Sequence, residues 1–351
     1  MPELFGHTYT RDQLTRMVGD MSQLAGVRLG SFEEGNARGV RVADVHTGSG
    51  LCFSVLLDRA LDIGAASFQG RSLAWHATSG WAEGARYEPE GLGWLRSWGG
   101  GLMTGCGMSW MGAPSVDGEE ALGLHGRMSH LAAYHVNTGA AWEGDAYNIW
   151  VEGEIKEAVT FGAKLHLKRR ISTQLGATWL RIHDRVTNIG YQPAPHMLLY
   201  HVNFGFPVVS PESELIADIA ETTPRTEIAA TGIDVFRQFQ EPTPGYAEQV
   251  FYHILRTDAD GFAQAAIVNR ALDFGAYVRY RAAELPWLIE WKMMGAQDYV
   301  CGLEPTTAWA DGRDKARRDG QLKVLEPQEA VEYALEIGVL PTREAIEGFA
   351  S

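Results

Sequence analysis

Apolar and polar residues alternate along most of this chain in short runs, the spacing that places every second side chain on one face of a β-strand. The clearest runs are rich in β-branched and apolar residues and span 40–45, 51–57, 151–155, 163–171 and 178–186. Turn signals such as Asn188-Ile-Gly190 and Asp311-Gly312 separate such runs, and no regular strand–helix rhythm links them. The pattern predicts an all-β fold, a sandwich or a barrel, and the lack of linkers and repeats predicts one domain.

One stretch near the N-terminus departs from this pattern and predicts an amphipathic helix. Thr10 and Gln13 have the spacing of a capping box, in which each side chain bonds to the backbone N–H of the other. The apolar residues that follow fall on one stripe: Leu14, Met17, Val18, Met21 and Leu24. With Gly26 as its stop, the helix divides the chain into an N-terminal helical extension, 1–26, and a β-sandwich, 27–351.

The overall charge limits the expected partners. The formal net charge is −14 and the isoelectric point about 5.2, so nucleic-acid phosphates and anionic membrane surfaces should repel the chain. No stretch has the length and apolar character of a membrane span, and the first residues lack the regions of a secretory signal. The three cysteines are an odd number without CxxC spacing, which favours a reducing compartment. We therefore expect a cytoplasmic protein with a small-molecule partner.

The strongest candidate for chemistry is Glu304, in the segment Tyr299-Val-Cys-Gly-Leu-Glu-Pro-Thr-Thr307. It directly precedes Pro305, which cannot donate to a β-ladder, so we expect the carboxylate at the end of a strand. Upstream, residues 286–291 have the bulk of a strand with Trp287, Ile289 and Trp291 on one face. A solvated strand end is the alternative reading of this carboxylate.

Two histidines in apolar or glycine-rich segments could act with this carboxylate. His125 lies in Leu124-His-Gly-Arg127, and His201 lies in Leu199-Tyr-His-Val-Asn-Phe-Gly205. A carboxylate and an imidazole at opposite edges of a neutral sugar can remove one proton and supply another. Aromatic faces suit a sugar ring, and the aromatic residues near these groups are Tyr200, Phe204, Phe206, Trp287 and Trp291. Two histidines and a glutamate are also a common zinc set, but they lack HExxH spacing, so we predict no metal and leave this alternative open.

Several further side chains are candidates for substrate contact. Arg59, between Asp58 and Asp62, is either a structural ion pair or a donor for sugar hydroxyls. His76, after Trp75, could line the same substrate cavity as Arg59. Lys292 could reach a ligand or be solvated.

Other motifs predict no catalytic role. The three glycines at 99–101 lack the Walker and dinucleotide-binding patterns. We therefore expect their backbone to approach another part of the molecule closely, at the floor of the pocket. The charged residues in 163–171 and 178–186, His166 and His183 included, predict a solvated sheet face. Cys106 and Cys301 are expected to be buried filler.

Five of these segments, in this order, resemble the galactose mutarotase-like (aldose 1-epimerase) superfamily, and more closely a bacterial branch labelled a domain of unknown function and often called "aldose 1-epimerase family protein". They are Leu57-Asp-Arg-Ala-Leu-Asp-Ile63, Gly99-Gly-Gly-Leu-Met-Thr-Gly-Cys-Gly107, Leu124-His-Gly-Arg127, Leu199-Tyr-His-Val-Asn203 and Cys301-Gly-Leu-Glu-Pro305. The resemblance covers the chain from about Gly39 to Pro305. It implies a large antiparallel β-sandwich with the sugar in a groove across one sheet, and no cofactor.

The resemblance also implies roles for single residues. Glu304 matches the general base of the superfamily, and His201 matches its general acid. His125 matches a histidine that assists binding, and Asn203 belongs to the same motif as His201. Arg127 stands where the galactose mutarotases have glycine, which suggests a substrate with an acidic group or an altered hydroxyl pattern.

We therefore expect an enzyme that interconverts the anomers of an aldose or sugar derivative. Two alternatives stay open: another isomerase, epimerase or lyase reaction on the same scaffold, with or without a metal, and a sugar-binding or regulatory protein without turnover.

Overall fold

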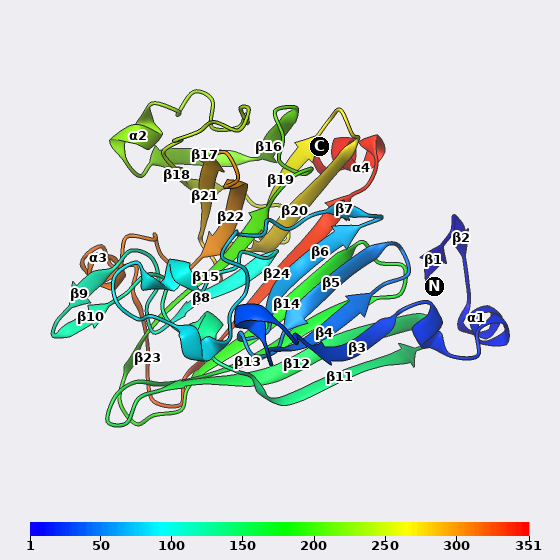
Figure 1. Cartoon of the computed structure of the whole chain (residues 1–351), viewed down its shortest axis with the longest axis horizontal. Helices are drawn as coiled ribbons and strands as arrows, with labels where there is room; N and C mark the ends of the chain where they lie inside the picture. Colours follow the sequence, from blue (N-terminus) through cyan, green and yellow to red (C-terminus); the bar gives the residue numbers. More distant parts are fainter. Residues whose placement is uncertain (351) are drawn as a thin grey trace.

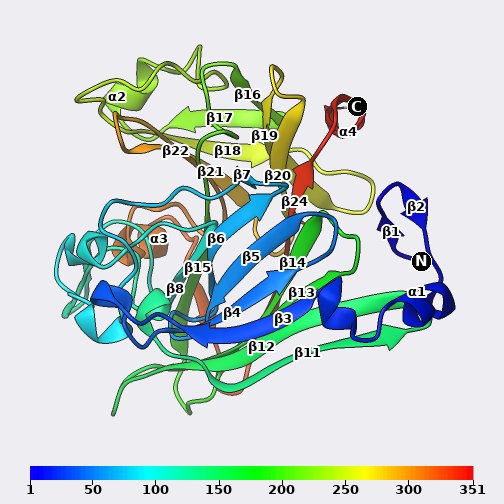
Figure 2. The same cartoon turned by 45° about the vertical axis from the view of Figure 1, so that its right-hand side comes forward.

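Two large antiparallel β-sheets make up most of the computed structural model, which describes residues 1–350 (Figure 1). The smaller sheet has eight strands, in the spatial order β11 (Tyr134–Glu143), β12 (Ala146–Ala158), β13 (Lys164–Gln174), β14 (Trp179–Asn188), β24 (Ala330–Leu340), β20 (Phe274–Arg281), β19 (Phe262–Asn269) and β16 (Ser213–Ala217). In Figure 2 its strands β11 and β12 lie beneath β3 and β4 of the larger sheet, as expected for a sandwich.

The larger sheet has 12 strands. Ten form a continuous series: β17 (Ile219–Pro224), β18 (Gln249–Leu255), β21 (Trp287–Met294), β22 (Tyr299–Thr306), β15 (Ala194–Phe204), β8 (Met103–Met108), β6 (Asp62–Phe68), β5 (Leu51–Leu56), β4 (Arg41–His46) and β3 (Gly26–Ser31). Two short strands are added at the sides, β7 (Arg71–Ser72) beside β6 and β23 (Lys323–Leu325) beside β15. The predicted all-β sandwich is confirmed, and each of the five predicted runs overlaps a strand.

The remaining elements are short. Two hairpins lie outside the main sheets, β1 (Glu3–Leu4) with β2 (His7–Thr8), and β9 (Ser115–Asp117) with β10 (Glu120–Leu122). The helices are α1 (Arg11–Met17), α2 (Glu227–Ala230), α3 (Arg313–Arg318) and α4 (Arg343–Ala350), with 3-10 turns at Met21–Gln23, Gly35–Ala37, Gly84–Arg86, Gly93–Arg96 and Met128–His130. Among residues 1–350, no helix is long and apolar enough to cross a membrane.

The predicted N-terminal helix is shorter than expected. Its capping box is present: Gln13 N–H donates to Thr10 Oγ1 at 3.2 Å, and Thr10 N–H donates to Gln13 Oε1 at 2.8 Å. The helix nevertheless ends at Met17, because Asp20 accepts a hydrogen bond from Ser22 N–H and starts a separate 3-10 turn. The stretch 1–26 also contains the hairpin of β1 and β2, and β3 begins at Gly26.

The charged rows on β13 and β14 lie on the outer face of the smaller sheet, as predicted. Arg170 is 44% exposed and pairs with Glu152, and His183 is exposed. His166 is half-buried and its Nε2 lies 3.0 Å from Glu154. The opposite faces of the same strands are buried between the two sheets.

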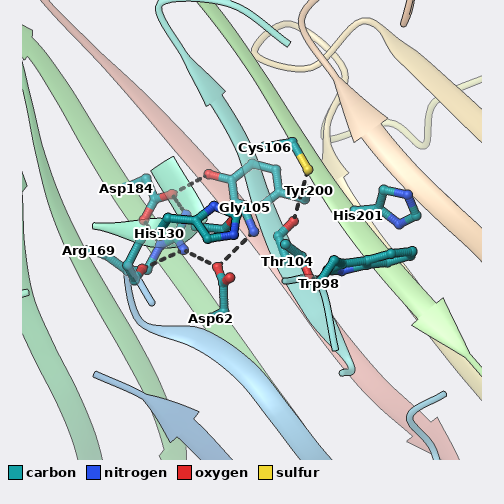
Figure 3. Close-up of polar contacts among 12 residues, drawn as sticks. Asp62, Trp98, Thr104, Gly105, Cys106, His130, Arg169, Asp184, Tyr200 and His201 are labelled. Atoms are coloured by element: carbon teal, nitrogen blue, oxygen red, sulfur yellow. Dashed lines mark hydrogen bonds and ion pairs between the residues drawn. The ribbon is translucent and has the colours of Figure 1, made fainter. Parts of the chain in front are cut away.

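A buried ion-pair cluster crosses that interior (Figure 3). Arg169 on β13 donates from Nε and NH2 to Asp184 on β14, at 2.9 and 2.6 Å, and both side chains are fully buried. Tyr200 of β15, in the larger sheet, donates its hydroxyl to Asp184 at 2.7 Å. Asp62 of β6 lies 3.8 Å from Arg169 and accepts a hydrogen bond from Gly105 N–H of β8 at 2.8 Å. The cluster therefore ties the two sheets together through five strands.

We expect Arg169→Gln to destabilise the protein by about 3–5 kcal/mol, because it leaves Asp184 buried without its cation. Arg170→Gln, one residue along on the solvated face, is the matched control and should cost about 0–1 kcal/mol. Urea denaturation followed by tryptophan fluorescence measures both. Equal losses in the two variants would contradict a supporting role for the cluster.

Candidate functional site

Two neighbouring strands of the larger sheet bring His201 and Glu304 together. β15 and β22 run antiparallel with Val202 opposite Leu303, a register that places His201 opposite Glu304. Directly opposed side chains extend from the same face of a sheet. Nε2 of His201 accordingly lies 3.3 Å from Oε1 of Glu304.

The prediction that the strand ends before Pro305 is wrong. β22 continues to Thr306, and Pro305 pairs with Leu288 of β21. On its other side the register places Pro305 opposite Tyr200, and no ladder pair forms between them. A proline fits here because this position of the ladder needs no N–H donor.

Alternation along β15 separates the core from the site. Tyr200 points into the space between the sheets, and His201 extends from the other face (Figure 3). The predicted aromatic setting is therefore corrected: Tyr200 and Phe204 belong to the inter-sheet core, and Phe206 is 71% exposed.

Tryptophans from other segments surround His201 instead. Ring centroids of Trp98 and Trp291 lie 5.1 and 5.3 Å from that of His201. Trp75 packs against both tryptophans, at 5.4 and 6.2 Å, but does not itself line the pocket. Trp287 lies farther along the strand, against Trp309.

These groups open into a pocket of about 300 Å³. Its lining residues come from the larger sheet and from the loops that cover it: Leu92, Trp94, Leu95, Trp98, Ala113, Pro114, Leu124, His125, His201, Arg225, Glu248, Val250, Ile289, Trp291, Glu304 and Ala310. The ring centroid of His125 is 5.6 Å from that of His201 and 4.9 Å from that of Trp94. Nδ1 of His125 is buried without a hydrogen-bond partner, so it is free to contact a ligand.

Asn203 orients His201 rather than lining the pocket. Its Nδ2 donates to the carbonyls of Gly101 and His201, at 3.1 and 2.9 Å. Its Oδ1 is thereby directed at Nδ1 of His201, 2.5 Å away, and accepts the proton of that nitrogen. Nε2 then faces Glu304 as the nitrogen that gains or loses a proton.

Burial shifts the pKa values of His201 and Glu304 in opposite directions. Desolvation lowers the pKa of His201 to about 4, although the hydrogen bond to Asn203 opposes the shift. Desolvation raises the pKa of Glu304 well above its ordinary value, and Glu248 adds to the rise. The pKa of His125 is lowered well below its ordinary value by burial and by His201. Both shifts favour the uncharged forms, a protonated Glu304 beside a neutral His201, and Oε1 of Glu304 is buried without a hydrogen-bond partner.

Arg225 and Glu248 are two charged lining residues that the sequence did not indicate. Arg225 donates from Nε to Asp311 at 2.9 Å and from NH2 to the Ala310 carbonyl at 3.2 Å. Glu248 accepts a hydrogen bond from Nε1 of Trp291 at 2.7 Å. Neither residue belongs to a recognisable motif, so only the fold could place them at this pocket.

Two predicted contact residues, Arg59 and Lys292, are buried away from the pocket. Arg59 is buried, donates to the Ala82 carbonyl at 2.7 Å and lies 3.4 Å from Nε2 of His130. Lys292 is neither solvated nor at a ligand site: strand alternation turns it away from Trp291, and Nζ donates to the carbonyls of Val235 and Gln238. These contacts satisfy both cations, so they are removed from the candidate site.

His76 and Arg127 are corrected for a different reason. His76 is exposed and its ring packs on Trp81, 5.1 Å away, outside the pocket. Arg127 lies two residues after His125 but faces a second cavity, with its guanidinium 5.1 Å from the centre of the Trp110 ring. Arg127 therefore gives no reason to expect an acidic substrate in this pocket.

Neither the alternative metal set nor the cysteines form a site in this fold. Among residues 1–350, no three His, Cys, Asp or Glu side chains are arranged to hold a metal ion, so His125, His201 and Glu304 do not fit a zinc set. Cys106 and Cys301 are free and fully buried, and desolvation raises the pKa of each thiol well above its usual value.

The glycine run makes the close approach that was predicted, but not at the pocket. A Cβ on Gly100 would lie 2.6 Å from the Trp75 carbonyl oxygen, and one on Gly101 would lie 2.7 Å from that of Ile63. The run therefore packs the Trp75 segment and β6 against the start of β8.

The fold places the protein among galactose mutarotase-like β-sandwiches. The structure superposes with a TM-score of 0.89 on a Klebsiella pneumoniae protein provisionally named an aldose 1-epimerase, at 25% identity over 97% of this chain and 89% of that one. A galactose mutarotase-like protein from Clostridium acetobutylicum gives 0.60 at 12% identity, covering 90% of this chain and 98% of the other. A galactose 1-epimerase from Lactobacillus acidophilus gives 0.58 with the same identity and coverage.

The family is shown by the sequence itself. Residues 37–339 match the model of a domain of unknown function, DUF4432, and the chain belongs to that family. No curated protein matches the chain.

We expect His201 to be neutral at neutral pH, with its proton on Nδ1, and to gain a second proton only near pH 4. Because the folded pKa lies below the ordinary value of 6.5, the unfolded chain takes up this proton first. His201 should therefore reduce stability progressively as the pH falls from 6.5 towards 4. Long-range ¹H–¹⁵N spectra of the imidazole measure both the tautomer and the titration.

Asn203→Ala is the control for the tautomer, since it removes the acceptor at Nδ1. A wild-type His201 that titrates at or above 6.5 would contradict the assignment.

Proposed function

We propose that this protein is an aldose 1-epimerase-like enzyme that interconverts sugar anomers by acid–base catalysis without a cofactor. The observation that carries the proposal is the pairing of Glu304 and His201, 3.3 Å apart at the base of a tryptophan-lined pocket. A buried carboxyl–imidazole pair that holds one proton can accept a proton at one atom while it donates at the other.

The adjacent placement of the two groups suits a cyclic hemiacetal. The anomeric hydroxyl and the ring oxygen are bonded to the same carbon, so one acid–base pair on one side of the sugar can reach both. The sequence predicts Glu304 and His201 at opposite edges of the substrate. Because the two residues are cross-strand neighbours, the arrangement to test is one in which both lie on the same side of the sugar.

Ring opening starts from the minor tautomer of the pair, in which Nε2 of His201 carries the proton and Glu304 is ionised. Glu304 takes the proton of the anomeric hydroxyl, the electrons of that O–H form the carbonyl, and the bond from C1 to the ring oxygen breaks. Nε2 of His201 gives its proton to the ring oxygen, which leaves a protonated Glu304 and a neutral His201. Rotation about C1–C2 and the reverse transfers close the ring on the other face.

The remaining lining residues bind and orient the sugar. Nδ1 of His125, buried without a partner, is available to a sugar hydroxyl. Trp94, Trp98 and Trp291 supply apolar surface for the faces of the ring. Asn203 is a positioning residue, because it acts only through His201.

We expect Glu304→Gln and His201→Gln each to lower the rate of anomer exchange by about 10²–10⁴-fold, the usual contribution of general acid–base catalysis. His76→Gln, a histidine outside the pocket, should leave the rate unchanged. One-dimensional NMR of anomer exchange across neutral and acidic aldoses and ketoses, with and without EDTA, measures this.

Three outcomes would redirect the proposal. Loss of activity with EDTA would favour a metal-assisted reaction. No acceleration of anomer exchange, but conversion of a panel sugar to another product, would favour another isomerase, epimerase or lyase reaction. Saturable sugar binding without any conversion would favour a non-catalytic binding protein.

We also expect neutral aldoses to be better substrates than the corresponding uronic acids, by roughly tenfold or more in kcat/KM. Arg225 is the cation of the pocket lining, but Asp311 neutralises it and Glu248 adds a negative charge. Glucose against glucuronate, and galactose against galacturonate, are the matched pairs. A preference for the acidic member would mean that Arg225 leaves Asp311 to bind the substrate.

A further inference from the structure

A second and larger cavity lies on the other side of the segment that carries His125. Its volume is about 1440 Å³, and it is bounded by the β9–β10 hairpin, α3, the β12–β13 turn and the β14–β15 loop. Of these elements, α3 and the β9–β10 hairpin lie side by side at the left of Figure 1. This cavity and the Glu304 pocket share no lining residue, so the two are separate.

Two side chains of opposite charge face this cavity with unused hydrogen-bonding atoms. Glu157, at the end of β12, is 4% exposed, and its Oε2 is buried without a partner. Its other oxygen, Oε1, accepts a hydrogen bond from the Ser109 hydroxyl. Arg127 has a buried Nε without a partner, and its side chain makes no hydrogen bond and no ion pair with the residues that the structure describes. An unsatisfied buried polar atom costs about 1–3 kcal/mol, so a bound ligand would recover a substantial stabilisation here.

The other cations of the cavity wall have partners. Arg313 donates to Asp117 at 2.6 Å and also to Glu120, and Arg317 donates to Asp117 at 2.9 and 2.7 Å. These bonds hold α3 against the β9–β10 hairpin and leave those guanidinium groups structural. Lys164 donates to the Gly162 carbonyl at 3.0 Å, so the charged side chains of this cavity with buried, unpartnered atoms are Glu157 and Arg127.

We propose that this cavity binds a neutral polyhydroxylated ligand, a carbohydrate or polyol, through Glu157 and Arg127. A hydroxyl group can donate to Oε2 of Glu157, and a neighbouring hydroxyl can accept from Nε of Arg127. An anion would meet the carboxyl of Glu157, and a cation would meet Arg127, so a neutral donor and acceptor fits both.

The carboxyl suits such a ligand in either protonation state. Burial raises the pKa of Glu157 to about 7, against the hydrogen bond from Ser109 and the charge of Arg127. A hydroxyl accepts from the protonated form and donates to the ionised form, whereas a charged ligand would tolerate only one of them.

This site goes beyond the proposed function and does not depend on it. His125 and Arg127 share one segment, and Gly126 between them has a φ of 78° that directs the chain between Trp110 and Gly107. A ligand on Arg127 is thus two residues from a side chain of the Glu304 pocket.

The test uses probes without a free anomeric hydroxyl, so that turnover cannot interfere: methyl glucopyranoside, methyl galactopyranoside, sucrose and myo-inositol. We expect at least one of them to perturb the Nε–H signal of Arg127 saturably in ¹H–¹⁵N spectra of the full chain. Glu157→Gln keeps the acceptor for Ser109 but replaces the free acceptor with a donor, and should weaken this binding roughly tenfold or more. Arg127→Met should weaken it similarly, as measured by calorimetry.

Glu304→Gln is the matched control: it should abolish anomer exchange and leave binding at Arg127 unchanged. Thermal melting shows whether each variant is folded. The proposal is overturned if no probe perturbs Arg127 up to its solubility limit, if Glu157→Gln and Arg127→Met both bind as wild type does, or if phosphate or acetate binds in place of the sugars. None of these results would alter the outcome of the anomer-exchange assay.

Discussion

The buried bond between Arg169 and Asp184 is the constraint on which the rest of the structure depends. Two charges removed from water are stable only when their geometry and additional hydrogen bonds repay the cost of desolvation. Here the additional partners include Tyr200 and Asp62, which belong to strands of the other sheet. The hydrogen bond from Tyr200 to Asp184 forms only when Tyr200 lies on the inner face of β15, so the cluster favours the observed arrangement of the two sheets.

That choice of face creates the site. With Tyr200 held at the inner face, strand alternation puts His201 on the outer face, opposite Glu304. The same low dielectric that penalises an unpaired charge shifts the two groups towards their neutral forms. Two such groups 3.3 Å apart can each exchange a proton with the same sugar, which is what the proposed ring opening requires. Stability and the proposed chemistry thus follow from the same burial.

The segment from Gly123 to Arg127 separates the two cavities of the molecule. Leu124 and His125 face the smaller one, and Gly123 and Arg127 face the larger one. A side chain at Gly126 would collide with the Trp110 carbonyl, 2.5 Å from its Cβ, so glycine lets the chain pass between the two cavities. The unpartnered atoms of His125, Arg127 and Glu157 lie on the two sides of this partition, whereas Arg59 and Lys292, though chemically similar, are satisfied by backbone carbonyls.

The sequence by itself determined the all-β class, because period-two alternation is a local property that survives in any sandwich. It also determined that His201, Glu304 and His125 stand out, because a titratable group in an apolar run has few structural uses. Only the tertiary structure decided how they act together. The register of β15 against β22 set the contact of His201 with Glu304, and loops far away in sequence supplied Trp98, Arg225 and Glu248. The errors also concern the direction of side chains. Lys292 directly follows Trp291 but points to the opposite face of the strand, and Arg127, which replaces a glycine of the galactose mutarotases, lies beyond the turn at Gly126 and faces the other cavity.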